Sequence, residues 1–242
     1  MSVRVSRFFT EQALDSESSV VVKGDQAHYI RNVLRLNVGD PLVVFNGTGG
    51  EYPGTIAAID KKSVTITLGA FNPINRTQQG AVALGLCTLK REAMDLTLQK
   101  AAELGVSTIQ PLISERITVS HKQIQSRQSH WQGVVTSACE QCGLNLVPEV
   151  LSPKSLQSWC ASTTGVKLIA DPDARSGEIP ESIDQSYSLL VGPEGGFSAE
   201  EITQSIAADF KGIYLGPRIL RAETAAISLL ALVNQRPERN SR

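Results

Sequence analysis

Two short segments in the last quarter of the chain combine glycine-rich turns with charged side chains. The first glycine turn is Gly192-Pro193-Glu194-Gly195-Gly196, and the second begins at Gly216-Pro217 and continues to Arg221 and Glu223. Glycines lack side chains, so a small ligand can approach the backbone closely, and open amides can face it. Charged residues in an otherwise apolar segment are costly to bury unless they have partners. The two segments together predict a binding pocket for a small ligand.

Each glycine turn lies between an expected strand and an expected helix. Apolar runs at 187–191 and 213–215 precede the turns and read as buried strands. Ser198 and Glu201 have the spacing of a capping box, so a helix should begin after Ser198. The second helix is expected from Ala222 to Leu232, and it is apolar on almost all sides. The pocket should therefore lie where two strands end and two helices begin.

The sequence lacks the motifs of several common enzyme classes. It contains neither the G-x-x-x-x-G-K-[ST] phosphate loop nor the G-x-S-x-G nucleophile elbow. The glycine order in 192–196 does not match G-x-G-x-x-G, which disfavours a dinucleotide fold. The histidines are scattered, which argues against a histidine-centred triad: His28, His121 and His130. By elimination, the remaining candidate is a binding site made of backbone loops with arginine, glutamate and threonine side chains.

Composition describes an ordinary globular protein. Of 242 residues, 41% are hydrophobic and 19% charged, enough for one large domain or two modest ones. The net charge of −1 gives no general attraction to nucleic acid, so any RNA contact must rest on a local basic patch. Cys139 and Cys142 form a C-x-x-C, but no second pair completes a zinc site, and we expect no metal. With no signal peptide and no membrane-length apolar run, we expect reduced thiols in a cytoplasmic protein.

The pattern of elements changes near residue 72. Before it, short strands at 41–45, 52–59 and 64–68 and a helix at 25–36 suggest a small β-barrel. The polar stretch 72–80 is the best linker candidate. After it, strands alternate with helices, as in a parallel α/β sheet; strands are expected at 81–87, 107–112 and 166–170, helices at 92–104 and 125–142, and a loop at 171–186. We therefore expect domains at 1–72 and 73–242.

The basic residues of the first domain have two readings. Five of them lie in its expected strands and helix and in the turn between two strands: Arg7, Arg31, Arg35, Lys61 and Lys62. They could form one side that faces phosphates, or they could be an ordinary solvated surface. The sequence leaves both readings open.

The two glycine turns with their flanking residues carry a resemblance to a known family. Val191-Gly192-Pro193-Glu194-Gly195-Gly196-Phe197-Ser198 and Leu215-Gly216-Pro217-Arg218-Ile219-Leu220-Arg221-Ala222-Glu223-Thr224 resemble the RsmE family of bacterial 16S rRNA uridine-N3 methyltransferases, within the SPOUT class. Further matching segments extend the resemblance over nearly the whole chain: Arg7-Phe8-Phe9, Val33-Leu34-Arg35 with His28, 99–106, Ser114-Glu115-Arg116 and 140–143.

The resemblance implies a fold, a methyl donor and a substrate. It implies an N-terminal PUA-like RNA-binding β-barrel and a SPOUT-type parallel sheet that ends in a trefoil knot, an exception to the rule that chains do not thread loops. It also implies a homodimer that holds S-adenosyl-L-methionine in the knot. The family's usual acceptor is uridine 1498 of 16S rRNA, in the decoding region of the small ribosomal subunit.

Site residues follow by transfer to matching positions. The donor is expected to contact Leu190, Gly192, Glu194, Gly195, Gly196, Leu215, Gly216, Ile219, Leu220 and Thr224. Arg221 and Glu223 are the expected catalytic residues: N3 of uracil must lose a proton, Arg221 could stabilise the resulting anion, and Glu223 could accept the proton or orient Arg221. A structural salt bridge of Arg221 with Glu223 or Glu194 is the alternative. RNA contacts are expected at Arg7, Arg31, Arg35, Lys90 and Arg116.

The chain departs from the family pattern at two positions. Leu144 and Leu146 follow Gly143, where the family pattern leads us to expect arginines. If those arginines meet RNA, their loss weakens binding and its salt dependence. Two other functions therefore stay open: a methyltransferase with another RNA acceptor (a ribose 2′-hydroxyl or a tRNA base), or a ribosome-assembly protein that binds RNA with weakened catalysis.

Overall fold

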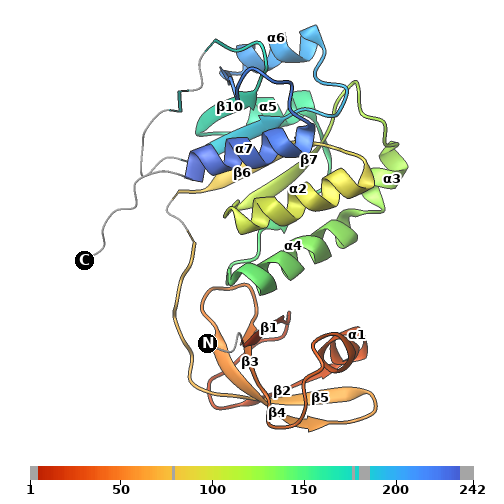
Figure 1. Cartoon of the computed structure of the whole chain (residues 1–242), viewed down its shortest axis with the longest axis vertical. Helices are drawn as coiled ribbons and strands as arrows, with labels where there is room; N and C mark the ends of the chain where they lie inside the picture. Colours follow the sequence, from red (N-terminus) through yellow and green to blue (C-terminus); the bar gives the residue numbers. More distant parts are fainter. Residues whose placement is uncertain (1–4, 78–79, 176–177, 180–185, 235–242) are drawn as a thin grey trace, which may run out of the picture. The chain divides into compact units, whose positions relative to one another are not determined.

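The computed structural model describes residues 5–77, 80–175, 178–179 and 186–234. The chain divides into two compact units (Figure 1). We call them the N-terminal unit, which contains the chain up to Thr77 together with Cys139–Val147, and the C-terminal unit, which contains Gln78–Ala138 and the chain from Pro148 onward. No helix among the described residues is long and apolar enough to span a membrane.

A curled five-stranded sheet forms the N-terminal unit, in the order β1-β3-β4-β5-β2. Its strands are β1 (Ser6–Phe9), β2 (Ser19–Lys23), β3 (Pro41–Phe45), β4 (Tyr52–Ile59) and β5 (Ser63–Leu68). Buried and exposed residues alternate along β2, as expected for a strand with one face on a core. The three strands predicted at 41–45, 52–59 and 64–68 are confirmed. A closed barrel was expected, but the described edge strands β1 and β2 do not pair with each other.

The helical segment of this unit is shorter and less regular than predicted. A single helix was expected at 25–36; the structure has α1 (Gly24–His28) followed by a π-helical turn, η1 (Tyr29–Val33). The backbone N–H of Leu34 donates to the carbonyl of Tyr29 at 3.0 Å, the wider spacing of a π-turn. The positive φ of Arg35, 56°, ends the helical path. Ile30 remains fully buried, so the apolar face predicted from the spacing is present.

A parallel sheet is the centre of the C-terminal unit, in the order β12-β10-β11-β6-β7-β8, with β9 also paired to β7. Its strands are β6 (Val82–Cys87), β7 (Thr108–Ile113), β8 (Glu149–Val150), β9 (Lys154–Ser155), β10 (Val166–Ala170), β11 (Tyr187–Val191) and β12 (Lys211–Ile213). All its pairings are parallel. The predicted α/β class with a parallel sheet is thus confirmed.

Helices cover this sheet. The helices α2 (Arg91–Glu103) and α7 (Ala222–Asn234) pack against each other, and Figure 1 shows them in front of the strands. A cluster of buried side chains joins Trp159 of α5 (Leu156–Ser162) to side chains of β6, β7, β10 and β11. Gly85 of β6 makes this contact possible, because a Cβ there would lie 2.4 Å from the Trp159 ring.

Several boundaries differ from the sequence predictions. The helix expected at 125–142 is α4 (Gln128–Cys142), and α3 (His121–Gln125), which precedes it across a turn at Ser126, was not predicted. The strand expected at 213–215 lies earlier, at β12. The short elements β8, β9 and α5 were not predicted, because runs of two to seven residues carry too little periodicity. Of the loop expected at 171–186, residues 176–177 and 180–185 lie outside the described residues.

Candidate functional site

A cavity of about 950 Å³ lies at the carboxyl ends of β10, β11 and β12. This edge is where ligands bind in open parallel sheets. The beginnings of α2 and α7 complete its lining, together with the first glycine turn (192–196) and residues 215–216 and 218–221. We call residues 214–221, between β12 and α7, the cavity loop. The two segments singled out from the sequence therefore lie on the same cavity.

The first glycine turn is shaped by its glycines. The backbone N–H of Gly196 donates to the carbonyl of Pro193 at 2.9 Å and closes the turn. Gly196 has a φ of +67°, a left-handed conformation that favours glycine. A Cβ at Gly192 would lie 3.0 Å from the Phe197 ring, so the ring packs directly on the glycine. The turn presents backbone rather than side chains to the cavity.

Contacts from neighbouring loops hold the turn. Glu194 accepts a hydrogen bond from the backbone N–H of Lys90, 2.8 Å away, at the beginning of α2. Arg116, in the loop after β7, donates through Nη1 to the carbonyl of Gly195 at 3.3 Å. A Cβ at Gly195 would lie 3.1 Å from the Cβ of Arg116, so the arginine stem lies against the glycine. The turn after β11 is thus held to the loops after β6 and β7.

The predicted capping box at the start of α6 (Ala199–Ala207) is confirmed. The Ser198 hydroxyl accepts from the backbone N–H of Glu201 at 3.3 Å, and Glu201 Oε2 accepts from the backbone N–H of Ser198 at 2.9 Å. The other oxygen of Glu201 accepts from the backbone N–H of Glu115 at 2.8 Å. Glu201 therefore fixes both its own helix and the loop that carries Arg116.

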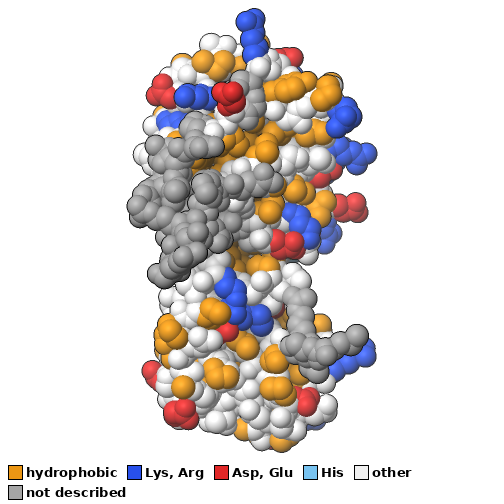
Figure 2. All heavy atoms as spheres, turned by 60° about the vertical axis from the view of Figure 1, so that its left-hand side comes forward, with side chains coloured by type: hydrophobic (Ala, Val, Ile, Leu, Met, Phe, Trp, Pro, Cys, Tyr) orange, Lys and Arg blue, Asp and Glu red, His pale blue; other side chains and the backbone are white. Residues whose placement is uncertain are grey.

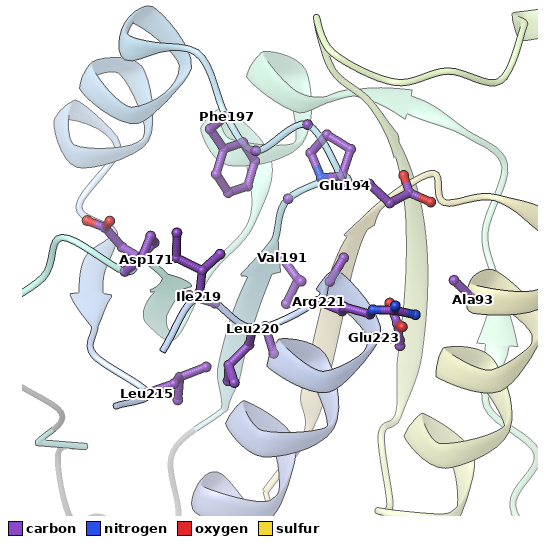
Figure 3. A pocket seen from close by; sticks show the side chains of 18 of the residues that line it. Ala93, Asp171, Val191, Glu194, Phe197, Leu215, Ile219, Leu220, Arg221 and Glu223 are labelled. Carbon is purple, nitrogen blue, oxygen red and sulfur yellow. The ribbon is translucent and has the colours of Figure 1, made fainter. Parts of the chain in front are cut away.

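The cavity loop forms the opposite wall. Gly216 has a φ of +114°, which the backbone needs to turn there. Ile219 is 91% exposed, unusual for a large aliphatic side chain, and Leu220 is half-buried. In Figure 3 this loop passes below the first glycine turn, and Val191 at the end of β11 lies between them. Apolar side chains and open backbone thus face each other across the cavity.

Arg221 and Glu223 lie where the cavity loop meets α7. The carbonyl of Arg221 accepts the N–H of Ala225 at 2.8 Å, the first turn of the helix. Figure 3 shows Arg221, Glu223 and Glu194 on the side of the cavity towards Ala93 of α2, and Asp171 and Leu215 towards the other side. No salt bridge joins Arg221 to Glu223 or Glu194 in the described chain. Arg221 and Glu223 are therefore available to a ligand, whereas one oxygen of Glu194 is engaged by the backbone N–H of Lys90.

Two residues expected at the donor do not line the cavity. Leu190 belongs to the core cluster with Trp159 on one face of the sheet, while its neighbour Val191 lines the cavity. This follows from the alternation of side chains along a strand. Thr224 is exposed on α7, outside the lining. The other expected donor residues line the cavity: Gly192, Glu194, Gly195, Gly196, Leu215, Gly216, Ile219 and Leu220.

Some lining residues were not anticipated from the sequence. Ala93 and Leu96 of α2, Phe197 and Asp171 also border the cavity. Asp171 directly follows β10, and a polar residue at the end of a buried strand could have indicated a place at the ligand-binding edge of the sheet. Ala93 and Leu96 gave no such signal, because an apolar residue on a helix is ordinarily assigned to the hydrophobic core.

The expected RNA-binding residues lie in both units of the chain and differ in their surroundings. Lys90 lines the cavity and Arg116 is exposed beside it. In the N-terminal unit, Arg31 donates to the carbonyls of Asp60 and Lys61, and Arg35 is exposed. The face in Figure 2 shows Lys and Arg side chains scattered among hydrophobic and acidic ones rather than gathered into one patch. Their roles in RNA binding stay predictions.

Arg7 belongs to a buried polar network of the N-terminal unit. Its side chain is 11% exposed, and the guanidinium donates to Glu51 and to the side-chain oxygen of Asn145. Arg76 also donates to Glu51 at 2.9 Å and to the carbonyl of Gly143 at 3.0 Å. Burial raises the pKa of Glu51, but the hydrogen bonds and charges of Arg76 and Arg7 outweigh it and hold that pKa below its usual value. The network ties residues 143–145 to the strands of this unit.

Comparison with known proteins agrees with this geometry. Residues 76–234 match a family described as an RNA methyltransferase domain, and residues 22–69 match an RNA methyltransferase PUA domain. The chain is similar to the ribosomal RNA small subunit methyltransferase E of Buchnera aphidicola from Schizaphis graminum, with 36% identity over 95% of this chain and 96% of the relative. The corresponding enzyme of Bacillus subtilis is 26% identical over 97% and 98% of the two chains.

Two solved structures share the fold at substantial identity. The ribosomal RNA small subunit methyltransferase E of Neisseria gonorrhoeae, bound to S-adenosyl methionine, has a TM-score of 0.88 and 31% identity over 95% of this chain and 97% of that one. A Legionella pneumophila protein described as a methyltransferase, in complex with the same cofactor, has a TM-score of 0.88 and 32% identity over 96% and 97%.

Proposed function

The chain belongs to the ribosomal RNA small subunit methyltransferase E family, and from this we propose that it transfers a methyl group from S-adenosyl-L-methionine to N3 of a uridine in 16S rRNA. The observation that carries the proposal is the pairing of a glycine-lined cavity with Arg221 and Glu223 at one side of it. The cavity is suited to the methyl donor, and Arg221 and Glu223 are suited to the removal of the proton from N3 of the uridine.

The cavity is suited to S-adenosyl-L-methionine in size and character. A volume of about 950 Å³ lies within the range of small-molecule sites. Val191, Leu215 and Leu220 offer apolar surface for a purine ring, and the first glycine turn offers backbone polar groups for the ribose and the amino-acid end. We assign Gly192, Gly195, Gly196 and Gly216 to the close backbone approach. Glu194 and Lys90 fix the turn against α2.

The residues beside the cavity suit the proton transfer that this reaction needs. Bound S-adenosyl-L-methionine supplies an electrophilic methyl group on a sulfonium. N3 of uracil must lose its proton to become nucleophilic, and the negative charge then spreads over the ring. Arg221, which has no salt bridge among the described residues, supplies a positive charge to stabilise that anion. Glu223 accepts the N3 proton or orients Arg221.

Three further features are proposed with this function. The N-terminal unit, which contains the PUA match, is the RNA-binding domain, and the C-terminal unit, which holds most of the RNA methyltransferase match, is the methyltransferase domain. The C-terminal segments form the trefoil knot of the family. The chain acts as a homodimer, as the family resemblance implies, and Leu232 of α7 is an exposed apolar side chain that a second copy would cover. Analytical ultracentrifugation measures whether the chain is a dimer in solution.

Transfer of radiolabel from the donor tests the proposed reaction. The chain is incubated with labelled S-adenosyl-L-methionine and small ribosomal subunits that lack this methylation, and the RNA is digested to nucleosides. Label in N3-methyluridine is the expected result. Label in a 2′-O-methylated nucleoside or in tRNA identifies another acceptor. Donor binding without transfer to any RNA would indicate a ribosome-assembly protein instead.

A further inference from the structure

We propose that Glu201 is a positioning residue: through the backbone N–H of Glu115 it holds Arg116 beside the donor cavity, where Arg116 contacts the RNA substrate. The inference rests on the proposed function and adds to it a residue that touches neither substrate. The Glu201 carboxylate would align the first glycine turn, which binds the donor, with the loop after β7, which binds RNA.

The geometry joins two loops that are distant in sequence. Glu201 is separated from Glu115 by 86 positions, yet its Oε1 lies 2.8 Å from the backbone nitrogen of Glu115. Its Oε2 lies 2.9 Å from the backbone nitrogen of Ser198, two residues after the first glycine turn. One rigid carboxylate therefore spans the end of the turn after β11 and the beginning of the loop after β7. Because β6 lies between these strands in the sheet, the span crosses a whole strand.

The two loops also touch at a second point. The stem and backbone of Arg116 lie against Gly195, where a Cβ would come within 3.1 Å of the Arg116 Cβ and 3.3 Å of its carbonyl oxygen. A side chain at this position would push the Arg116 segment away by a few tenths of an ångström. The Nη1 of Arg116 reaches the Gly195 carbonyl at 3.3 Å, a long hydrogen bond at an exposed position. The guanidinium thus keeps most of its donors for a partner in solution.

The burial of Glu201 shows that the contact is more than a helix cap. Its side chain lies near the buried thiols of Cys87 and Cys160 and is 9% exposed. A buried carboxylate is costly unless its oxygens accept hydrogen bonds. Here each oxygen accepts one backbone N–H, and loss of either leaves a buried polar group without a partner. The arrangement therefore resists movement of the Glu115 backbone, and with it Arg116.

The charge of Arg116 suits the phosphate groups of RNA. The side chain is exposed and forms no salt bridge among the described residues. Lys90, fixed at its own backbone N–H by Glu194, lines the cavity at the next loop. Two glutamates near the first glycine turn thus each hold the backbone of a loop that presents one cation. A negatively charged, extended ligand next to the donor is the partner that this arrangement fits.

A double-mutant cycle tests the positioning role with the full-length protein. The variants are E201Q, R116A and E201Q/R116A, with KM and Kd for unmethylated small subunits and Kd for S-adenosyl-L-methionine as readouts. A glutamine has one acceptor oxygen, so it can keep only one of the two N–H bonds. We expect E201Q and R116A each to raise KM and Kd for subunits by about tenfold and the double variant to do no more. Donor Kd should rise by less than about threefold, because the contact of Glu194 with the backbone N–H of Lys90 still holds the first glycine turn.

Matched controls separate positioning from helix stability. S198A removes the hydroxyl half of the capping box and leaves the Glu115 contact in place, so it should lower the Tm without the change in subunit Kd. E200Q alters the exposed neighbour and should change neither. E115P removes the backbone N–H that Glu201 accepts from and leaves Glu201 itself unchanged. It should raise the subunit Kd as E201Q does, and it carries the test if E201Q does not fold.

Each outcome decides the point. Additive effects of E201Q and R116A, an equal rise in donor Kd, or an S198A variant with the same loss of subunit binding would overturn the positioning role. So would an R116A variant that binds subunits as tightly as the wild type. A wild type that binds subunits but transfers no methyl group would overturn the proposed function only, and the subunit Kd values of the same cycle would still test Glu201.

Discussion

Glu194 accepts a hydrogen bond from the backbone N–H of Lys90, 2.8 Å away and 104 positions earlier in the chain. Lys90 is the residue before α2, and its own side chain makes no capping hydrogen bond. The carboxylate of the first glycine turn therefore does what a capping side chain would do, from another loop. The negative charge also lies at the positive end of the α2 dipole. The contact joins two parts of the cavity lining, the first glycine turn and the beginning of α2.

Two substitutions of Glu194 separate its hydrogen bond from its charge. E194A removes the acceptor and frees the turn, so we expect donor Kd to rise by about tenfold, the effect of a hydrogen bond to a charged group. E194Q keeps an acceptor oxygen at the same reach and should lose less than about threefold. Isothermal titration calorimetry with S-adenosyl-L-methionine measures both. Equal losses in the two variants would mean that the charge, and not the contact with Lys90, determines binding.

Arg221→Ala should separate catalysis from donor binding. If Arg221 stabilises the uracil anion, its loss lowers kcat by about 10²-fold or more, because the stabilised charge exists only as N3 reacts. Donor Kd should change by less than about threefold, since the first glycine turn and the cavity loop remain. Arg221→Lys keeps a positive charge and should recover part of kcat. Equal losses of turnover and donor binding would instead indicate a structural role for the arginine.

Sequence patterns predicted the local elements well because their signals are local. The apolar run 187–191 is β11 and the run 166–170 is β10, and the spacing of Ser198 and Glu201 predicted the capping box. Glycine-rich turns after strands predicted where the cavity lies. Each of these signals depends on residues within a few positions of one another.

Long-range contacts were beyond the sequence. Nothing in the spacing of Glu201 predicts its bond to Glu115, and nothing in the segment 139–147 predicts that it belongs to the N-terminal unit. Arg7 looked like a surface cation, but Glu51 and Asn145 surround it in the folded chain. The π-turn at 29–33 has the apolar spacing of an α-helix and is distinguished by hydrogen bonds alone.

Glu51→Gln should destabilise the chain in a pH-dependent way. It leaves Arg7 and Arg76 without a compensating charge, so we expect a loss of about 3 kcal/mol in the free energy of unfolding near pH 7. The folded-state pKa of Glu51 is lowered, so its contribution is full above the unfolded-state pKa and falls as pH drops through the folded-state pKa. Urea unfolding between pH 7 and about pH 3 should show the two proteins converging. A constant difference would exclude the ion pairs as the cause.

Two glycine-to-alanine substitutions should have opposite effects on stability. Gly85→Ala places a Cβ 2.4 Å from the Trp159 ring, so the packing of α5 on β6 must shift at a cost of about 1–3 kcal/mol. Gly133, within α4, has no atom within 4 Å of an added Cβ and no positive φ. Alanine there should raise the free energy of unfolding by about 0.5–1 kcal/mol. Thermal unfolding compares them; a Gly85→Ala variant as stable as the wild type would contradict the contact.

Arginine at positions 144 and 146 should act differently at the two sites, although both leucines depart from the family pattern in the same way. Leu144 is 6% exposed and Leu146 is 38% exposed. L144R would bury a charge and should lower the Tm by several degrees, about the effect of 1–3 kcal/mol. L146R adds an accessible cation beside Gly49 and should leave the Tm nearly unchanged.

If the segment after α4 faces RNA, L146R should also strengthen binding to small subunits. One more phosphate contact steepens the slope of log K against log salt by about 1. Titrations at several salt concentrations measure the slope, and L146Q is the matched control because it is polar without charge. An L146R slope equal to that of L146Q would place the RNA surface of the N-terminal unit elsewhere. The present leucine would then be an ordinary surface residue, and its departure from the family pattern would carry no loss of RNA affinity.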